Sequence, residues 1–209
     1  MKKNFILSTI VLAALTLSQN SWAYYSTMDT GDLIAPNKYR VGAETQFITD
    51  EDSGVNIIGR FDKGFNDEMN FKAELGFGTT DFHLGGYVKW IPIPDYENQP
   101  AIGVTSGLLF AQYDSETEIS IRIHPMISKG FDVEFGRLTP YASAPTGLRT
   151  FDGDTDIPLQ VNFGSDVYFQ ELQYWHFKAE VGFDVSEAFT YISFGASLDF
   201  DEENGIQFR

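Results

Sequence analysis

The sequence predicts an all-β protein folded as a closed, antiparallel up-and-down barrel of about ten strands, with eight strands as the alternative. Three observations predict this fold class. Apolar and polar residues alternate with a period of two through ten segments, short connections rich in Asp, Asn, Gly and Ser separate most of these segments, and no window after the N-terminus approaches the length of a membrane-spanning helix. A period of two gives each strand two chemically different faces.

The N-terminal residues have the order of a secretory signal peptide. Lys2 and Lys3 precede an apolar run, Phe5 to Leu17, and a short polar stretch then ends in Ser21-Trp22-Ala23. A charged start, an apolar centre and a small-residue end are typical of such signals. We therefore expect residues 1–23 to be removed near Ala23 in a Gram-negative bacterium. A retained anchor helix is disfavoured, because the apolar run is shorter than the roughly 20 residues that a spanning helix needs.

The charge balance excludes one class of partner. Loss of the signal would leave 12 basic and 30 acidic residues, whereas nucleic-acid binding requires clustered positive charge. We therefore expect no nucleic-acid partner. The sequence also has no cysteine, so an exported chain of this kind must be stabilised by burial, by a closed sheet or by the membrane.

Along the chain, residues 24–38 show no alternation and are expected to be irregular. The barrel is expected over 39–200, and 201–209 are expected to form a short acidic tail. The ten predicted strands are 39–48, 54–62, 69–78, 81–90, 102–110, 116–127, 137–149, 157–169, 175–184 and 190–200. Pro140 and Pro145 weaken the seventh of these as a central strand, so it is expected to be two short pieces or one bulged strand.

The two faces of the strands differ in a way that favours a membrane. Eight basic and ten acidic residues lie on the polar faces, whereas the centres of the apolar faces carry no charge and aromatic rings gather near their ends. Aromatic residues at both ends of an apolar band are typical of a membrane interface. The polar faces would then line the barrel interior, where charges need partners. The predicted interior network consists of Glu44, Arg60, Lys72, Glu74, Arg122 and Glu180.

The last strand carries a more specific pattern. Ser193, Gly195, Leu198 and Phe200 in "SFGASLDF" match the assembly signal of bacterial outer-membrane β-barrels, although nine residues follow Phe200 where that signal normally ends the chain. Over residues 39–200 the chain resembles small porin-like outer-membrane proteins with a closed antiparallel transmembrane β-barrel. The resemblance implies outer-membrane lipid, lipopolysaccharide and the outer-membrane assembly machinery as partners.

Three functions follow as hypotheses. The first is non-enzymatic: a structural or interaction barrel, or a narrow pore for small solutes. The second is a soluble periplasmic barrel that binds a small apolar ligand, which would turn Ile119, Ile121 and Ile123 inward. The third is an outer-membrane enzyme acting on lipid or peptide and using His124 or His176, but no nucleophile–base motif is apparent.

No cofactor or metal is predicted. Asp152, Asp154 and Asp156 resemble the start of a calcium loop, but the following Gly and the distant Glu are missing and Pro158 intervenes. Turn formation explains these aspartates more simply. Weak divalent-cation bridging between the acidic loops and lipopolysaccharide is left as a hypothesis.

Overall fold

The computed structural model describes residues 25–49, 53–113, 116–203 and 205, so the predicted signal peptide, 1–23, lies outside the described residues. The strands are β1 (Lys38–Ile48), β2 (Gly54–Gly64), β3 (Met69–Gly78), β4 (Phe82–Ile93), β5 (Ala101–Tyr113), β6 (Glu116–Ser128), β7 (Phe131–Val133), β8 (Gly136–Ser143), β9 (Thr146–Phe151), β10 (Asp154–Asp156), β11 (Leu159–Phe169), β12 (Trp175–Ser186) and β13 (Tyr191–Asp201). No helix among the described residues is long and apolar enough to cross a membrane.

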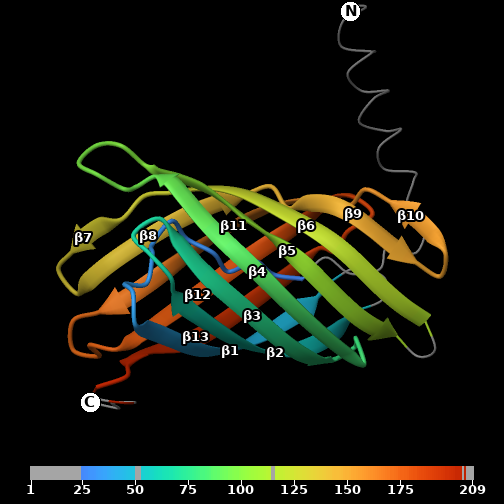
Figure 1. The fold of residues 1–209 in the computed structure, drawn as a ribbon, viewed down its shortest axis with the longest axis horizontal. Helices are drawn as coiled ribbons and strands as arrows, with labels where there is room; N and C mark the ends of the chain where they lie inside the picture. The colour runs from blue at the N-terminus through green and yellow to red at the C-terminus, as the bar shows by residue number, and fades with distance from the viewer. Residues whose placement is uncertain (1–24, 50–52, 114–115, 204, 206–209) are drawn as a thin grey trace, which may run out of the picture.

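Antiparallel pairing joins these strands into a closed ring (Figure 1). Each strand from β1 to β6 pairs with the next, β11 to β13 continue the ring, and β8 and β9 together bridge β6 to β11. Pairing of β1 with β13, from Lys38↔Asp201 to Ile48↔Tyr191, closes it. The barrel therefore has ten strands with β7 and β10 as short additions. The prediction of about ten strands is confirmed, and the eight-stranded alternative is wrong.

The seventh barrel strand is interrupted at Ala144 and Pro145. β8 pairs mainly with β11 on one side of the break, and β9 pairs with β6 on the other. The Ala144 N–H donates to the Pro125 carbonyl (3.1 Å), and the Pro145 carbonyl accepts from the Gln160 N–H (3.0 Å). Since proline has no N–H to donate, the ladder changes partner at this position. The strand is thus two pieces.

The two ends of the barrel are distinguished by the chain termini. We call the end where β1 begins and β13 ends the near end, and the opposite end the far end. The β1–β2, β3–β4, β5–β6, β9–β10 and β12–β13 connections lie at the far end. The β9–β10 connection is tight, since Asp152 and Gly153 have φ of 47° and 87°. Residues 154–156, predicted as part of a loop, form β10 because this turn uses just two residues.

Side chains on β6 show how the two faces are arranged. Ile119, Ile121 and Ile123 are 57%, 52% and 44% exposed, whereas Arg122 and His124 are buried inside the barrel. A soluble barrel with an apolar ligand site requires the opposite arrangement. The outer surface is therefore apolar and the interior is polar, as in barrels that span a membrane.

Aromatic rings form contacts near both ends of the barrel. Phe77 lies against Phe82 near the far end, with ring centroids 5.6 Å apart. Tyr39 stacks on Phe200 near the near end, with centroids 5.3 Å apart, and Phe177 lies 5.8 Å from Phe169 at the same end. This arrangement matches the two aromatic girdles of membrane barrels.

The residues of the predicted assembly signal all lie on β13. Ser193 is buried in the lumen and Gly195 lies against Met28, whose Sδ would be 3.1 Å from a Cβ at that position. Phe200 stacks on Tyr39, as described above. Leu198 is only 4% exposed, because its register partners Val41 and Trp175 flank it on the outer surface.

Spin labels would test the orientation of the faces. A label at Ile121→Cys in lipid vesicles should collide more often with dissolved oxygen than with a water-soluble nickel complex, because oxygen concentrates in the bilayer. A label at Phe65→Cys, in the exposed near-end turn between β2 and β3, should show the reverse order. Access of the nickel complex to position 121 would contradict a lipid-facing surface.

A polar cluster at the near end joins the β4–β5 connection to the residues between β6 and β7. Asp95 in the β4–β5 connection accepts from Lys129 Nζ (2.5 Å) and from the Gly130 N–H (2.7 Å), and Arg137 Nη2 lies 3.4 Å away. Partial burial opposes ionisation of this carboxyl group. The two hydrogen bonds and the charges of Lys129 and Arg137 outweigh that effect and lower the pKa of Asp95 below its usual value.

This cluster should make stability depend on pH with a defined sign. Because the pKa of Asp95 is lower in the folded protein, its contribution is present above the unfolded value of about 3.9 and is lost as pH falls through the folded value. Asp95→Asn should lower the free energy of unfolding in urea by about 0.5–1 kcal/mol at pH 7. The difference from wild type should vanish near pH 2. A constant difference, or an equal effect of the exposed control Asp132→Asn, would contradict this.

Candidate functional site

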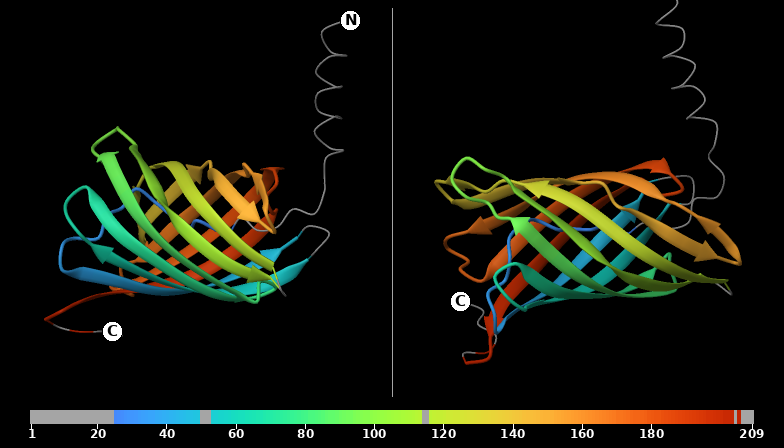
Figure 2. Two further views of the ribbon diagram at one scale, coloured as in Figure 1. Left: turned by 45° about the vertical axis from the view of Figure 1, so that its right-hand side comes forward. Right: turned by 45° about the horizontal axis from the view of Figure 1, so that its top comes forward.

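The lumen of the barrel is occupied by the chain's own N-terminal segment. Residues 25–37, which we call the lumen segment, enter at the near end next to β1 and run through the ring to the far end (Figure 2). The side chains of Tyr25 to Thr30 are all 3% exposed or less. A fully extended chain of this length reaches about 40 Å, more than the roughly 25 Å apolar band of a membrane barrel.

Local chemistry explains how the lumen segment turns back from β1. Asn37 has φ of 64°, a left-handed conformation that asparagine tolerates, and the Lys38 N–H donates to the Ala35 carbonyl (3.1 Å). Pro36 precedes Asn37 and pre-sets the turn. Farther inside, Gly31 packs so closely that a Cβ there would lie 2.3 Å from Ala101 Cβ. Small residues thus let the segment fit inside the ring.

A clamp of two lysines holds the only carboxylate among the buried residues of the lumen segment. Asp29 Oδ1 lies 3.0 Å from Lys89 Nζ, and Asp29 Oδ2 lies 3.0 Å from Lys72 Nζ. Thr105 Oγ1 donates to Oδ2 (2.6 Å). Asp29 is 2% exposed, so these contacts replace the water that a buried charge would otherwise need.

Glu180 of β12 forms the second contact site for the segment. Its carboxylate accepts from the consecutive backbone N–H groups of Thr27 and Met28, both at 2.8 Å. The hydroxyl groups of Tyr141 and Tyr191 also donate to it, at 2.8 and 2.5 Å. Among the described residues Glu180 has no cationic partner within ion-pair distance. Donors from the lumen segment and from tyrosines therefore satisfy this buried carboxylate.

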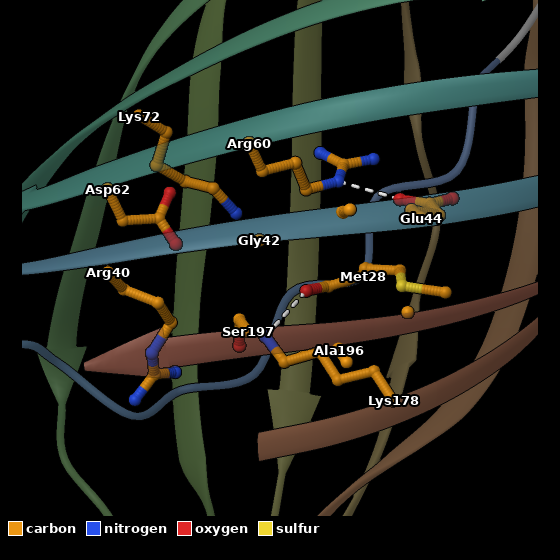
Figure 3. A pocket seen from close by; sticks show the side chains of 12 residues that line it. Met28, Arg40, Gly42, Glu44, Arg60, Asp62, Lys72, Lys178, Ala196 and Ser197 are labelled. Atoms are coloured by element: carbon orange, nitrogen blue, oxygen red, sulfur yellow. Dashed lines mark hydrogen bonds and ion pairs between the residues drawn. The ribbon is translucent and has the colours of Figure 1, made fainter. Parts of the chain in front are cut away.

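Arg60 of β2 links the barrel wall to the segment. Its Nε and Nη1 atoms lie 2.7 Å from Glu44 and 2.7 Å from Glu74, and its Nη2 donates to the Ser26 carbonyl (2.6 Å). Figure 3 shows the Arg60–Glu44 pair and the Lys178 side chain, whose Nζ donates to the Met28 carbonyl (3.0 Å). The guanidinium group thus contacts β1, β3 and the lumen segment together.

Tyr25 closes the lumen at the far end. Its ring stacks on His83 with centroids 3.9 Å apart, and Arg122 Cζ lies 5.0 Å from the ring centroid. The Tyr25 hydroxyl donates to Thr80 Oγ1 (3.0 Å) and shares a hydrogen bond of 2.5 Å with Tyr113. Apolar side chains of β1, β5 and β13 pack around these groups. An aromatic layer therefore fills the lumen near the far end.

All six residues of the predicted interior network point into the barrel, but their partners differ from simple pairs across the wall. Arg60 joins Glu44 and Glu74, and Arg122 Nη2 lies 3.3 Å from Glu118. Lys72 and Glu180 bind the lumen segment. The predicted set omitted Asp29, Lys89, Thr105, Tyr141 and Tyr191. Four of these lie on polar strand faces, whereas no periodicity marks Asp29.

The three histidines lie in different environments. His176 Nδ1 is 3.1 Å from Asp166, and its Nε2 is 2.9 Å from Arg40 Nη2. His83 stacks on Tyr25, and the ring of His124 lies 5.8 Å from that of Tyr87. Neither ring nitrogen of His83 has a hydrogen-bond partner among the described residues, and those of His176 lie against Asp166, Arg40 and Asp199, so neither of these two rings is paired with a serine or threonine hydroxyl as a nucleophile–base pair requires.

The described residues leave cavities beside the lumen segment. A small one of about 30 Å³ lies between Met28 and the wall formed by β1, β2 and β13, and has room for one or two water molecules (Figure 3). A larger one of about 330 Å³ opens at the near end, lined by Arg40, Asp166, His176 and Asp199 among others. The lumen is thus filled at its centre and far end, and open at the near end.

The structure groups no three or more metal-ligating side chains among its described residues. Of the three aspartates near the β9–β10 turn, Asp156 accepts from Arg149 Nη2 (2.6 Å) and Nε (2.9 Å). This carboxylate is therefore engaged by a guanidinium group rather than directed towards Asp152 and Asp154.

Comparison with known proteins supports the fold. An outer-membrane channel from Pseudomonas putida F1 aligns over 85% of this chain and all of its own, with 8% identity and a TM-score of 0.50. A designed transmembrane β-barrel aligns over 81% of this chain with 12% identity and a TM-score of 0.42, and the N-terminal β-barrel domain of OprF from Pseudomonas aeruginosa over 80% with 10% identity and 0.36. Both align over their whole length.

No protein-family model and no curated protein matches the chain. At these identities the likeness concerns the fold alone. The closed ring, its apolar outer surface and the likeness to the Pseudomonas putida channel lead to one conclusion: the chain has the fold of a small outer-membrane β-barrel, without a more specific subfamily.

Proposed function

We propose that this protein is a narrow pore for small solutes in the outer membrane of a Gram-negative bacterium, and that the lumen segment keeps it closed at rest. The observation that carries the proposal is the way the lumen is filled. Its centre is occupied by a length of main chain that joins the barrel at its near end through the Pro36–Asn37 turn. Such a segment can leave the lumen while every strand stays paired.

The size of the ring supports this proposal. Eight strands enclose an interior that side chains alone can fill, and a ring of ten is wider. Several inward positions are glycines: a Cβ at Gly182 would lie 2.3 Å from the Tyr191 ring, and one at Gly85 would lie 2.6 Å from the Tyr87 hydroxyl. Wall side chains therefore pack flat against glycines, and the remaining space is taken by the segment.

The expected export of the chain adds to the argument. Cleavage near Ala23 would start the mature chain next to Tyr25, so the lumen segment would have a free end at the far mouth. With the start of β1 and the end of β13 both at the periplasm, as an even number of strands allows, the far end faces the cell exterior. Outer-membrane lipid and lipopolysaccharide would surround the barrel, and the assembly machinery would insert it.

We propose no enzymatic activity, because Glu44, Glu74, Glu180 and His176 are held by hydrogen bonds or ion pairs with the wall and the segment, and His83 stacks on Tyr25. A structural or interaction role remains as the second candidate. The aromatic layer around Tyr25 favours this structural role. The following experiment distinguishes it from the pore function.

Removal of the lumen segment should open the barrel. A variant lacking residues 25–35 keeps the expected signal and the Pro36–Asn37 turn. In planar lipid bilayers we expect discrete conductance steps from this variant and a mostly closed state from wild type. A heat-dependent shift in SDS electrophoresis should first show that each barrel is assembled. An assembled variant without conductance would contradict the pore and leave the structural role.

A cross-link provides the matched control. Thr27 Oγ1 lies 3.3 Å from Ser143 Oγ, so cysteines at these two positions are close enough to form a disulfide, and the sequence contains no other cysteine. Oxidised Thr27→Cys/Ser143→Cys should show none of the opening events that wild type shows at high voltage, and reduction should restore them. If the deletion variant fails to assemble, the full-length double variant Asp29→Asn/Glu180→Gln should raise the open fraction instead.

A further inference from the structure

The wall of the lumen contacts the lumen segment largely through main-chain groups. The N–H groups of Thr27 and Met28 donate to Glu180, and the Gly31 N–H donates to Ser128 Oγ (2.8 Å). Every peptide presents such N–H groups, whatever its side chains, except at proline. The wall therefore holds acceptors at positions that suit an extended peptide in general.

The carbonyl groups of the segment are recognised in the same way. Arg60 donates to the Ser26 carbonyl (2.6 Å), Lys178 to that of Met28 (3.0 Å) and Lys89 to that of Asp32 (2.6 Å). These donors are charged, and charge-assisted hydrogen bonds are about twice as strong as neutral ones. Six main-chain groups within seven residues are thus bound by side chains of the wall.

One side chain of the segment adds a charge requirement. Asp29 lies between Lys72 and Lys89, and Lys89 has Asp29 and the Asp32 carbonyl as its described partners. Without the segment, Lys72 and Lys178 would each keep a carboxylate of the wall nearby. Asp62 faces Lys72 in register, and Asp166 Oδ2 lies 3.6 Å from Lys178. Among the described residues Lys89 forms its ion pair with Asp29 and with neither of these two wall carboxylates, so the emptied clamp would attract an acidic group.

We propose that the lumen wall is a binding site for short acidic peptides, which are the solutes that the pore takes up, and that the lumen segment occupies this site in cis. This proposal rests on the proposed pore function, because a peptide reaches the site when the segment is out. Tethering explains how the segment fills the site at rest, since a short linker gives an effective concentration of the order of millimolar.

Calorimetric titration of the purified protein in detergent would test the site independently of conductance. The protein is a full-length variant in which 26–32 are replaced by alternating Gly and Ser, checked for assembly by its heat-dependent shift. The probe is the capped tripeptide acetyl-Met-Asp-Thr-amide, which copies residues 28–30. Its affinity should exceed that of acetyl-Met-Asn-Thr-amide by about tenfold or more, because the contacts of the clamp are made to a charged group.

Matched variants locate the effect. Lys89→Gln in the same background should abolish the preference for the Asp peptide. Arg149→Gln removes a charge from another buried wall residue, whose ion-pair partners are Asp156 and Glu187, and should leave the preference intact. If the Gly–Ser variant fails to assemble, the full-length variant Asp29→Asn/Glu180→Gln takes its place. We again expect a higher affinity for the Asp peptide than for the Asn peptide.

The outcomes separate the two proposals. Equal affinity for the Asp and Asn peptides, or no binding to an assembled barrel, would overturn the peptide site and leave the pore untouched. Acetate that competes as well as the peptide would show a general anion site and would also overturn it. Peptide binding by a barrel that conducts no ions would support the site and contradict the pore.

Discussion

The structure depends on closure of the ring by β1 and β13. Lipid offers no hydrogen-bond partner, so a sheet edge inside a membrane would leave a row of N–H and C=O groups unsatisfied at a cost of several kcal/mol each. Pairing along the whole of β1, from Lys38 to Ile48, removes both edges. Once the ring is closed, each strand has one face towards the outside and one towards the lumen, and the period-two pattern of the sequence follows from that.

Closure creates a second constraint, because a ring of ten strands encloses polar groups that side chains across the lumen do not fully satisfy. Lys72 and Lys89 find their carboxylate on Asp29, and Glu180 finds its donors on Thr27 and Met28. Removing one partner of a buried ion pair typically costs about 3–5 kcal/mol. The lumen segment is therefore part of the electrostatic balance of the wall as well as a filling of the space.

The sequence predicted the strands and their faces well, because alternation is a local property of each segment. It placed Arg60 beside Glu44 and Glu74 in one interior network, since neighbouring strands bring such residues together. It did not predict the location of residues 25–37, because irregular chain has no periodicity to read. A polar, glycine-containing stretch between a signal peptide and the first strand, long enough to cross the barrel, is the signal that could have suggested it.

The threaded path of the chain also constrains the order in which the molecule is assembled. A segment inside a closed ring arrives there in one of two ways: its end passes through an open mouth, or the last strands close around it. The Pro36–Asn37 reversal lays the segment along β1 at once, and β3 and β4 follow with Lys72 and Lys89. Glu180 on β12 and Gly195 on β13, which lie against Met28, come last in the chain. By the second route, closure of the ring would complete the contacts of the segment and the barrel in a single step, and the N-terminal residues would act as a template for the interior they occupy.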